Sequence, residues 1–167
     1  MNRRYQHSNW YNYLEQVTEV INVGDISMEL DLVSRDDIGP TEKDQLVKSR
    51  RGQGLFRARV ALVENGCRVT GVSEKTHLRA SHIKPWKNSS DLEKLDGYNG
   101  LLLAPHVDHL FDRGYISFED SGELITSPAL TSGILASWGM PITQNVGGFA
   151  PSQCKYLEWH RRNVLQW

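Results

Sequence analysis

Cysteine, long apolar runs and net charge are all scarce in this chain of 167 residues. The 2 cysteines, Cys67 and Cys154, lie far apart and form no CxxC pair, so we expect neither a thiolate zinc site nor a disulfide framework. No apolar run approaches the length of a membrane span, and the polar start MNRRYQHSNW does not resemble a signal peptide. We therefore expect a reduced, cytoplasmic protein without a membrane partner.

The net charge of −1 favours no class of partner, but its distribution is uneven. Residues 43–94 carry 12 Lys and Arg against 5 Asp and Glu, whereas the flanks, 1–42 and 95–167, are acidic. A basic block is typical of proteins that bind a polyanion such as nucleic acid. A solvated charged face has the same composition, so charge alone leaves both readings open.

The hydrophobic fraction of 39% is enough for a core, and the apolar pattern predicts an α+β domain preceded by an arm. Helical spacing predicts a helix over 9–22, and strict alternation predicts a strand over 26–32. The break DDIGP at 36–40 then separates an N-terminal arm, 1–40, from a domain over 41–167.

Within the domain, Thr41 is a candidate cap of a helix that Gly66 would end. The segments CRVTG (67–71) and THLRASHI (76–83) look like two strands of one hairpin, and Pro85 opens a loop. The remaining expected elements are a buried apolar run NGLLLAP, a short helix HVDHLFD, a second hairpin over 115–127 and a last helix over 151–163.

The short helix carries two carboxylates, Asp108 and Asp112, at positions i and i+4. Side chains at this spacing project from one helix face, where two carboxylates can share a hard cation such as Mg²⁺ that keeps several waters. Two solvated surface aspartates would have the same spacing. His109 with Asp112 is an i, i+3 pair and is held in reserve as a ligand.

His82 and Asn99 flank the predicted loop. A neutral imidazole exposed at a strand end can take a proton from water, because its ordinary pKa of about 6.5 lies near working pH. Asn99 with Gly100 favours a turn, and its side chain both donates and accepts hydrogen bonds, so it can also orient a histidine.

The order strand, His82, loop, Asn99, apolar run and acidic helix resembles the ββα-metal (His-Me finger) or HNH endonuclease family, especially the subgroup found in predicted restriction endonucleases. The resemblance is carried by ASHIKPW, YNGLLLAPHVDHLFDRGYISF, RRGQGLFRARVALVENGCRVTG and the closing YLEWHRRNVLQW. It covers residues 50–165 in pieces and leaves the arm without a counterpart. It implies an α+β fold built on a ββα core with additional helices.

The resemblance also implies roles for individual residues. His82 falls on the general base, Asn99 on the residue that holds the base and its loop, and Asp108 and Asp112 on the ligands of one divalent cation, Mg²⁺ or Mn²⁺. The implied reaction is hydrolysis of phosphodiester bonds in double-stranded DNA, of restriction type. Ser81 departs from the pattern, since many members have a metal-binding Asp there, and no structural zinc is expected.

Candidate DNA contacts are arginines near these residues. Arg79 and Arg113 flank the implied site, and Arg50 and Arg51 lie on the preceding helix, where they could track the phosphate backbone. Trp86 could pack on a base or sugar, although we expect it rather to close the core under the loop. Target preference would have to come from elsewhere, for example the arm or a homodimer partner.

Two other functions remain open from sequence. The first is a non-catalytic DNA-binding module with a degraded site, which Ser81 favours. The second is a zinc hydrolase that uses the histidines as ligands, although no HExxH spacing supports it; its ligands would be His77, His82, His106 and His109.

Overall fold

The computed structural model describes residues 34, 39–140 and 145–167 of the chain. The predicted helix over 9–22 and strand over 26–32 lie outside these residues, so the arm ending at residue 40 stays a prediction. The chain divides into two compact units, Met1–Ala58 and Arg59–Trp167. None of the helices in the described ranges is long and apolar enough to cross a membrane.

Helix α2 (Pro40–Val63) confirms the helix predicted before Gly66, and it begins at Pro40 rather than at Thr41. Proline fits the first turn of a helix because its missing N–H has no partner there in any case. Arg50 and Arg51 lie on α2, but their side chains are outside the described part of the structure. The last turn of α2 belongs to the second unit, where Val60 is completely buried.

The first hairpin pairs strand β1 (Arg79–His82) antiparallel with β2 (Gly100–Leu103), so that His82 lies opposite Gly100. The predicted pairing of 67–71 with 76–83 is therefore wrong. Residues 67–71 form a turn instead, in which the amide of Gly71 donates to the carbonyl of Cys67 at 2.8 Å and Gly71 has φ of +74°. All four residues of β2 are buried, which makes it the better apolar partner for β1.

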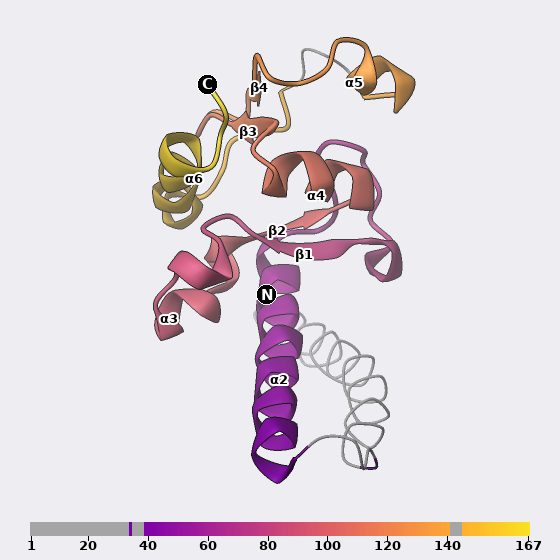
Figure 1. Cartoon of the computed structure of the whole chain (residues 1–167). Helices are drawn as coiled ribbons and strands as arrows, with labels where there is room; N and C mark the ends of the chain where they lie inside the picture. The colour runs from indigo at the N-terminus through magenta and orange to yellow at the C-terminus, as the bar shows by residue number, and fades with distance from the viewer. Residues whose placement is uncertain (1–33, 35–38, 141–144) are drawn as a thin grey trace, which may run out of the picture. The chain divides into compact units, whose positions relative to one another are not determined.

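Helix α4 (Pro105–Asp112) follows β2 directly and lies over the hairpin (Figure 1). Its side chains Val107, Leu110 and Phe111 are buried, whereas its polar residues face away from the core. Two antiparallel strands followed by a helix form the ββα core that the sequence predicted, and the fold is α+β.

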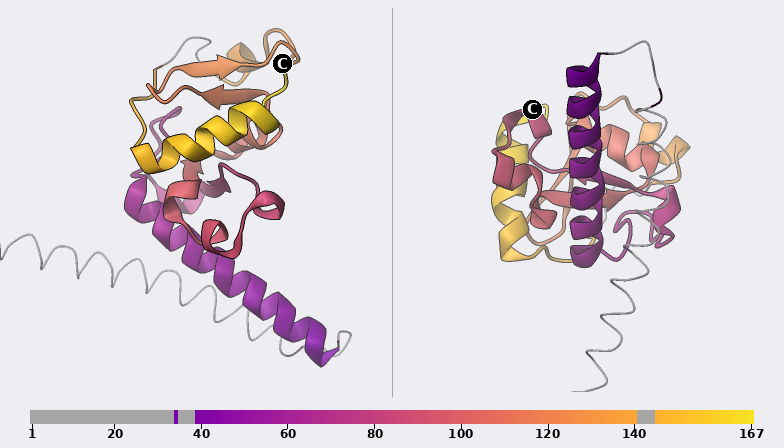
Figure 2. Two further views of the ribbon diagram at one scale, coloured as in Figure 1. Left: turned by 90° about the vertical axis from the view of Figure 1, so that its left-hand side faces the viewer. Right: turned by 90° about the horizontal axis from the view of Figure 1, so that it is seen from below.

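The second hairpin, β3 (Ile116–Phe118) with β4 (Leu124–Thr126), and the last helix, α6 (Pro151–Asn163), both form as predicted. Helix α6 packs along β3 (Figure 2). Short α5 (Ile134–Ser137) follows β4 in the chain.

His160 of α6 fastens these parts together inside the core. The ring is stacked on Phe111 with 3.9 Å between ring centres, and its Nε2 donates to the carbonyl of Phe111 at 3.0 Å. Its Nδ1 lies 3.0 Å from the Ser117 hydroxyl, which donates to it. His160 is 1% exposed, and burial lowers its pKa to about 4. The imidazole is therefore neutral at neutral pH and serves as packing.

Candidate functional site

The segment between β1 and β2 contains one short α-helix and two 3₁₀ helices. It contains η2 (Trp86–Asn88), α3 (Asp91–Lys94) and η3 (Gly97–Asn99), while η1 (Lys75–His77) precedes β1. We call residues 83–99 the crossing loop. His82 directly precedes it, and Asn99 is its last residue.

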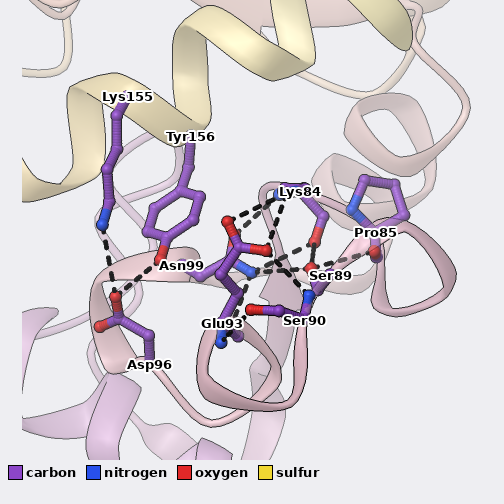
Figure 3. Close-up of polar contacts among 9 residues, drawn as sticks. All are labelled: Lys84, Pro85, Ser89, Ser90, Glu93, Asp96, Asn99, Lys155 and Tyr156. Carbon is purple, nitrogen blue, oxygen red and sulfur yellow. Dashed lines mark hydrogen bonds and ion pairs between the residues drawn. The ribbon is translucent and has the colours of Figure 1, made fainter.

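The side chain of Asn99 lies at the centre of the hydrogen-bond network of the crossing loop (Figure 3). Its side chain is 0% exposed; its Oδ1 accepts from the backbone amide of Lys84 at 2.8 Å. Its amide nitrogen is within 3.3 Å of the carbonyls of Lys84 and Glu93 and of the Ser89 hydroxyl. Because one buried amide joins both ends of the loop, the backbone on either side of it is held in a single arrangement.

A second set of contacts closes the loop at α3 (Figure 3). Ser90 and Glu93 form a capping box, and the Lys84 ammonium lies 2.8 and 3.0 Å from the two Glu93 carboxylate oxygens. The hydrogen bond from Lys84, followed by that from the Ser90 amide, lowers the pKa of Glu93. Helix α3 was not predicted, although Ser90 followed by Glu93 three residues later is a capping-box signal.

The far end of the loop is tied to its neighbours on two sides. The Tyr156 hydroxyl of α6 donates to Asp96 at 2.7 Å, and the Arg59 guanidinium donates to the carbonyl of Leu95 at 2.8 Å. At Gly97 the two backbones nearly touch, because a Cβ placed there would lie 2.5 Å from the carbonyl oxygen of Arg59. The loop is therefore packed on α6 and on the last turn of α2.

His82 is half-buried at the end of β1, where the crossing loop begins. Its Nε2 lies 3.0 Å from the carbonyl oxygen of Lys94. A carbonyl only accepts, so Nε2 carries the proton and the lone pair of the neutral ring is on Nδ1. Burial lowers the pKa of His82, and the bond to Lys94 opposes that change. The ring of Trp86 contacts the imidazole edge-on, with 5.5 Å between ring centres.

Asp108 and Asp112 lie at different points along the hairpin. The Asp108 carboxylate is 14% exposed and accepts from the Arg79 guanidinium at 3.1 Å. Asp112 is exposed and lines a pocket together with Trp86. Helix α4 contacts β1; Asp108 is paired with the residue that starts this strand, and Asp112 shares a pocket with Trp86, which follows its end.

The histidines of α4 contact an indole. The rings of His106 and His109 lie 6.0 and 6.2 Å from the ring of Trp138, centre to centre. Over the part of the chain that the structure describes, no three His, Cys, Asp or Glu side chains gather at one point. The four histidines of the zinc alternative are all described, so the structure does not support that alternative.

The pocket beside Asp112 has a volume of about 760 Å³. We call it the indole pocket; it is lined by the crossing loop, the end of α4 and α6, through side chains that include Trp86, Lys87, Asn88, Asp112, Trp159 and Asn163. Trp86 is 38% exposed, so the expectation that it closes the core is wrong. Trp86 follows Pro85 in a loop, where no helical or strand periodicity predicts whether a side chain is buried.

The candidate DNA contacts differ in their surroundings. Arg113 caps the C-terminus of α4 and its side chain is exposed. Arg79 is also exposed, but its guanidinium is paired with Asp108, which the sequence assigned to the cation. This pairing of a predicted phosphate contact with a predicted ligand has no signal in the sequence, because the two residues are 29 positions apart.

A buried ion pair lies away from these residues. Glu64 is 2% exposed and receives two hydrogen bonds from Arg68, at 2.7 and 2.8 Å, and one from Gln153 of α6 at 2.8 Å. The i, i+4 spacing of Glu64 and Arg68 is the signal in the sequence. The cluster joins the end of α2 to α6 and has a structural role.

Among known protein families, the model described as HNH endonuclease matches residues 67–119. No curated protein matches the chain. The matched segment contains β1, the crossing loop, β2, α4 and β3, and therefore His82, Asn99, Asp108 and Asp112. The ββα segment of this chain is thus similar to the HNH endonuclease family, in agreement with the prediction from its sequence.

Proposed function

We propose that this protein hydrolyses phosphodiester bonds of double-stranded DNA with the help of one divalent cation, and that His82 is its general base. The observation that carries the proposal is the bond from His82 Nε2 to the Lys94 carbonyl, at 3.0 Å. It fixes the tautomer that has its lone pair on Nδ1, in a loop that the buried Asn99 holds at both ends.

In the proposed step, Nδ1 of His82 takes a proton from water as the water oxygen attacks phosphorus. The bond from phosphorus to the 3′ oxygen breaks, and that oxygen leaves with the electron pair and takes a proton from solvent. The lowered pKa of His82 suits this role, because the imidazole is neutral and able to accept at pH 7. Asn99 is a positioning residue that acts through the loop backbone.

Two carboxylates on one helical turn suit Mg²⁺ or Mn²⁺, which binds through one or two carboxylates, waters and substrate phosphate. Asp108 and Asp112 would hold the cation, with His109 in reserve. When bound, it would compensate charge on the phosphate and on the departing oxygen. Within the described residues no third protein ligand joins them, so the substrate would complete the coordination.

Contacts to the DNA backbone would come from basic side chains. Arg113 lies next to Asp112, and Arg50 and Arg51 belong to the basic segment of the sequence. Arg79 would have to leave Asp108 to reach a phosphate. We extend this proposal to a restriction-type role and to a homodimer. The two subunits together would supply target preference and cut both strands.

A second function has specific support. A non-catalytic DNA-binding module is favoured by Ser81 at the position of a usual ligand, and by Arg79 on the Asp108 carboxylate. A guanidinium already neutralises that carboxylate, and such a protein would bind DNA without cutting it. It would not explain why the loop that holds His82 is so extensively hydrogen-bonded.

A plasmid-nicking assay separates the two functions. With Mg²⁺ or Mn²⁺, relaxed plasmid should appear and increase with time, and EDTA should prevent it. His82→Ala should reduce the rate by about 100- to 10,000-fold, the usual contribution of a general base. His77→Ala removes an exposed histidine of η1 and is the matched control, with a rate like that of the wild type.

The fold of each variant is checked by its melting temperature and circular dichroism. No nicking by the wild type with any divalent cation would leave the DNA-binding module as the function. Nicking by His82→Ala within a few-fold of wild type would refute the assignment of the base while leaving the nuclease activity in place.

A further inference from the structure

We propose that the indole pocket receives one unpaired base of the DNA, so that the preferred substrate is a duplex with an extruded or bulged base at the cut. The location of this base at the cut rests on the proposed function, whereas the binding of the base does not require catalysis. It names a subsite beside the proposed base and cation ligands.

The pocket has the chemistry of a nucleobase site. Two indoles, Trp86 and Trp159, provide flat apolar faces on which any base can stack. The amide side chains of Asn88 and Asn163 each donate and accept hydrogen bonds, which suits the polar edge of a base. The volume of about 760 Å³ lies within the range of small-molecule sites.

Lysine ammonium groups lie near the two indoles, and two of them are also paired with carboxylates: Lys84 with Glu93 and Lys94 with Asp91. The Lys94 ammonium lies 5.4 Å from the centre of the Trp86 ring, and the Lys84 ammonium lies 5.8 Å from the centre of the Trp159 ring. Lys87 is itself part of the lining. A stacked base brings its own phosphates with it, and these cations would attract them.

The pocket is continuous with the proposed catalytic residues. Asp112, a proposed cation ligand, belongs to its lining, and Trp86 contacts the His82 ring edge-on at 5.5 Å. A base held here would therefore belong to a nucleotide next to the scissile phosphate. In an intact duplex both faces of each base are covered by neighbours, so only an unpaired base can stack on an indole.

Fluorescence polarisation in EDTA tests the pocket without any cutting. The probes are two labelled 20-base-pair duplexes of the same sequence, one perfect and one with a single bulged thymine. The wild type should bind the bulged duplex about ten-fold more tightly, as expected for one stacked base. Equal binding of the two duplexes would overturn the proposal.

Variants at Trp159 identify the pocket as the cause. Trp159→Leu keeps an apolar side chain but removes the aromatic face, and should bind both duplexes equally; Trp159→Phe should keep most of the preference. Trp167→Ala is the matched control, because Trp167 is 79% exposed and outside the pocket, and it should bind like the wild type. An unchanged preference in Trp159→Leu would overturn the proposal even if the wild type prefers the bulge.

Nicking of the same two duplexes with Mg²⁺ separates this inference from the proposed function. Preference for the bulge in EDTA without any cutting would refute the nuclease and leave the base subsite. Cutting of both duplexes at equal rates, with equal binding, would refute the subsite and leave the nuclease.

Discussion

The two sides of the ββα core differ in how completely their polar groups are engaged. On the side of the crossing loop, Asn99 is 0% exposed and makes four side-chain hydrogen bonds, and the imidazole of His82 donates to a backbone carbonyl. On the side of α4, Asp112 is exposed and the carboxylate of Asp108 accepts a hydrogen bond from Arg79.

Under the proposed function, the difference would separate the part of the site that is formed in advance from the part that is not. The proposed base must point in one direction before its proton transfer, and the buried network of the loop would hold that direction. A cation that keeps waters and binds phosphate needs few protein ligands, so its side would be completed only when DNA binds. The following changes test this contrast, in order of decreasing effect.

Removing both carboxylates of α4 should have the largest effect on activity. We expect Asp108→Asn with Asp112→Asn to lower nicking by about 1,000-fold, since the cation supplies several kcal/mol of charge stabilisation. Mn²⁺ binding, followed by electron paramagnetic resonance, should weaken at least about ten-fold. Glu158→Gln, an exposed carboxylate of α6, is the control. Unchanged Mn²⁺ binding would mean that other residues hold the cation.

Truncating Asn99 should damage the loop side most. Asn99→Ala leaves the amide of Lys84 and the carbonyls of Lys84 and Glu93 without this partner, and we expect a loss of about 3 to 4 kcal/mol in the free energy of unfolding. Asn145→Ala, which removes one exposed bond to the Gly147 amide, should cost less than about 1 kcal/mol. Urea unfolding measures both, and similar losses would contradict the contrast.

The free energy of unfolding should depend on pH through His160, which packs on the apolar side of α4. Its pKa is lowered from 6.5 to about 4 in the folded state. Between these two pH values the unfolded chain is protonated at this histidine, whereas the folded chain is not. Stability is therefore complete above about pH 6.5 and falls as pH drops toward 4, by about 3 kcal/mol. The lowered pKa of His82 acts in the same direction.

Thermal or urea unfolding between pH 7.5 and 4 measures this loss, and a His160→Gln variant isolates its source. That variant should be less stable at pH 7.5 and should lose much less stability between pH 6.5 and 4 than the wild type. An equal loss in both proteins would assign the pH dependence to the carboxylates instead.

The smallest expected effect is that of the Arg79 ion pair. Arg79 is 64% exposed, so its bond to Asp108 contributes no more than about 1 kcal/mol. Because the guanidinium competes with a cation for that carboxylate, Arg79→Ala should tighten Mn²⁺ binding by about two- to five-fold. Arg162→Ala, which breaks a surface pair with Glu158, should leave Mn²⁺ binding unchanged. Weaker Mn²⁺ binding in Arg79→Ala would show that the arginine helps to assemble the site.

Local patterns in the sequence predicted most of the second unit. Helix α4, the β3–β4 hairpin and α6 form over the segments predicted for them, which are HVDHLFD, residues 115–127 and residues 151–163. The error concerned strand pairing. The sequence of a short strand does not specify which strand it pairs with. Residues 67–71 are close to β1 in sequence, whereas β2 is separated from β1 by the crossing loop.

The candidate site was predictable in its residue types but not in its contacts. The order of His82, Asn99 and the acidic helix could be predicted because it is an order along the sequence. The tautomer of His82, the Arg79 ion pair and the indole pocket depend on residues that meet only after folding. Trp159 and Trp86 are 73 positions apart, and no spacing rule links them.

Gly97 is a position in the crossing loop at which no larger residue fits. At Gly97 a methyl group would press into the carbonyl oxygen of Arg59, only two residues before Asn99. Even the mildest substitution there would wedge the loop away from its support and misdirect a histidine fifteen positions upstream. Loss of cutting without loss of any chemical group is therefore the signature to look for in a Gly97→Ala protein.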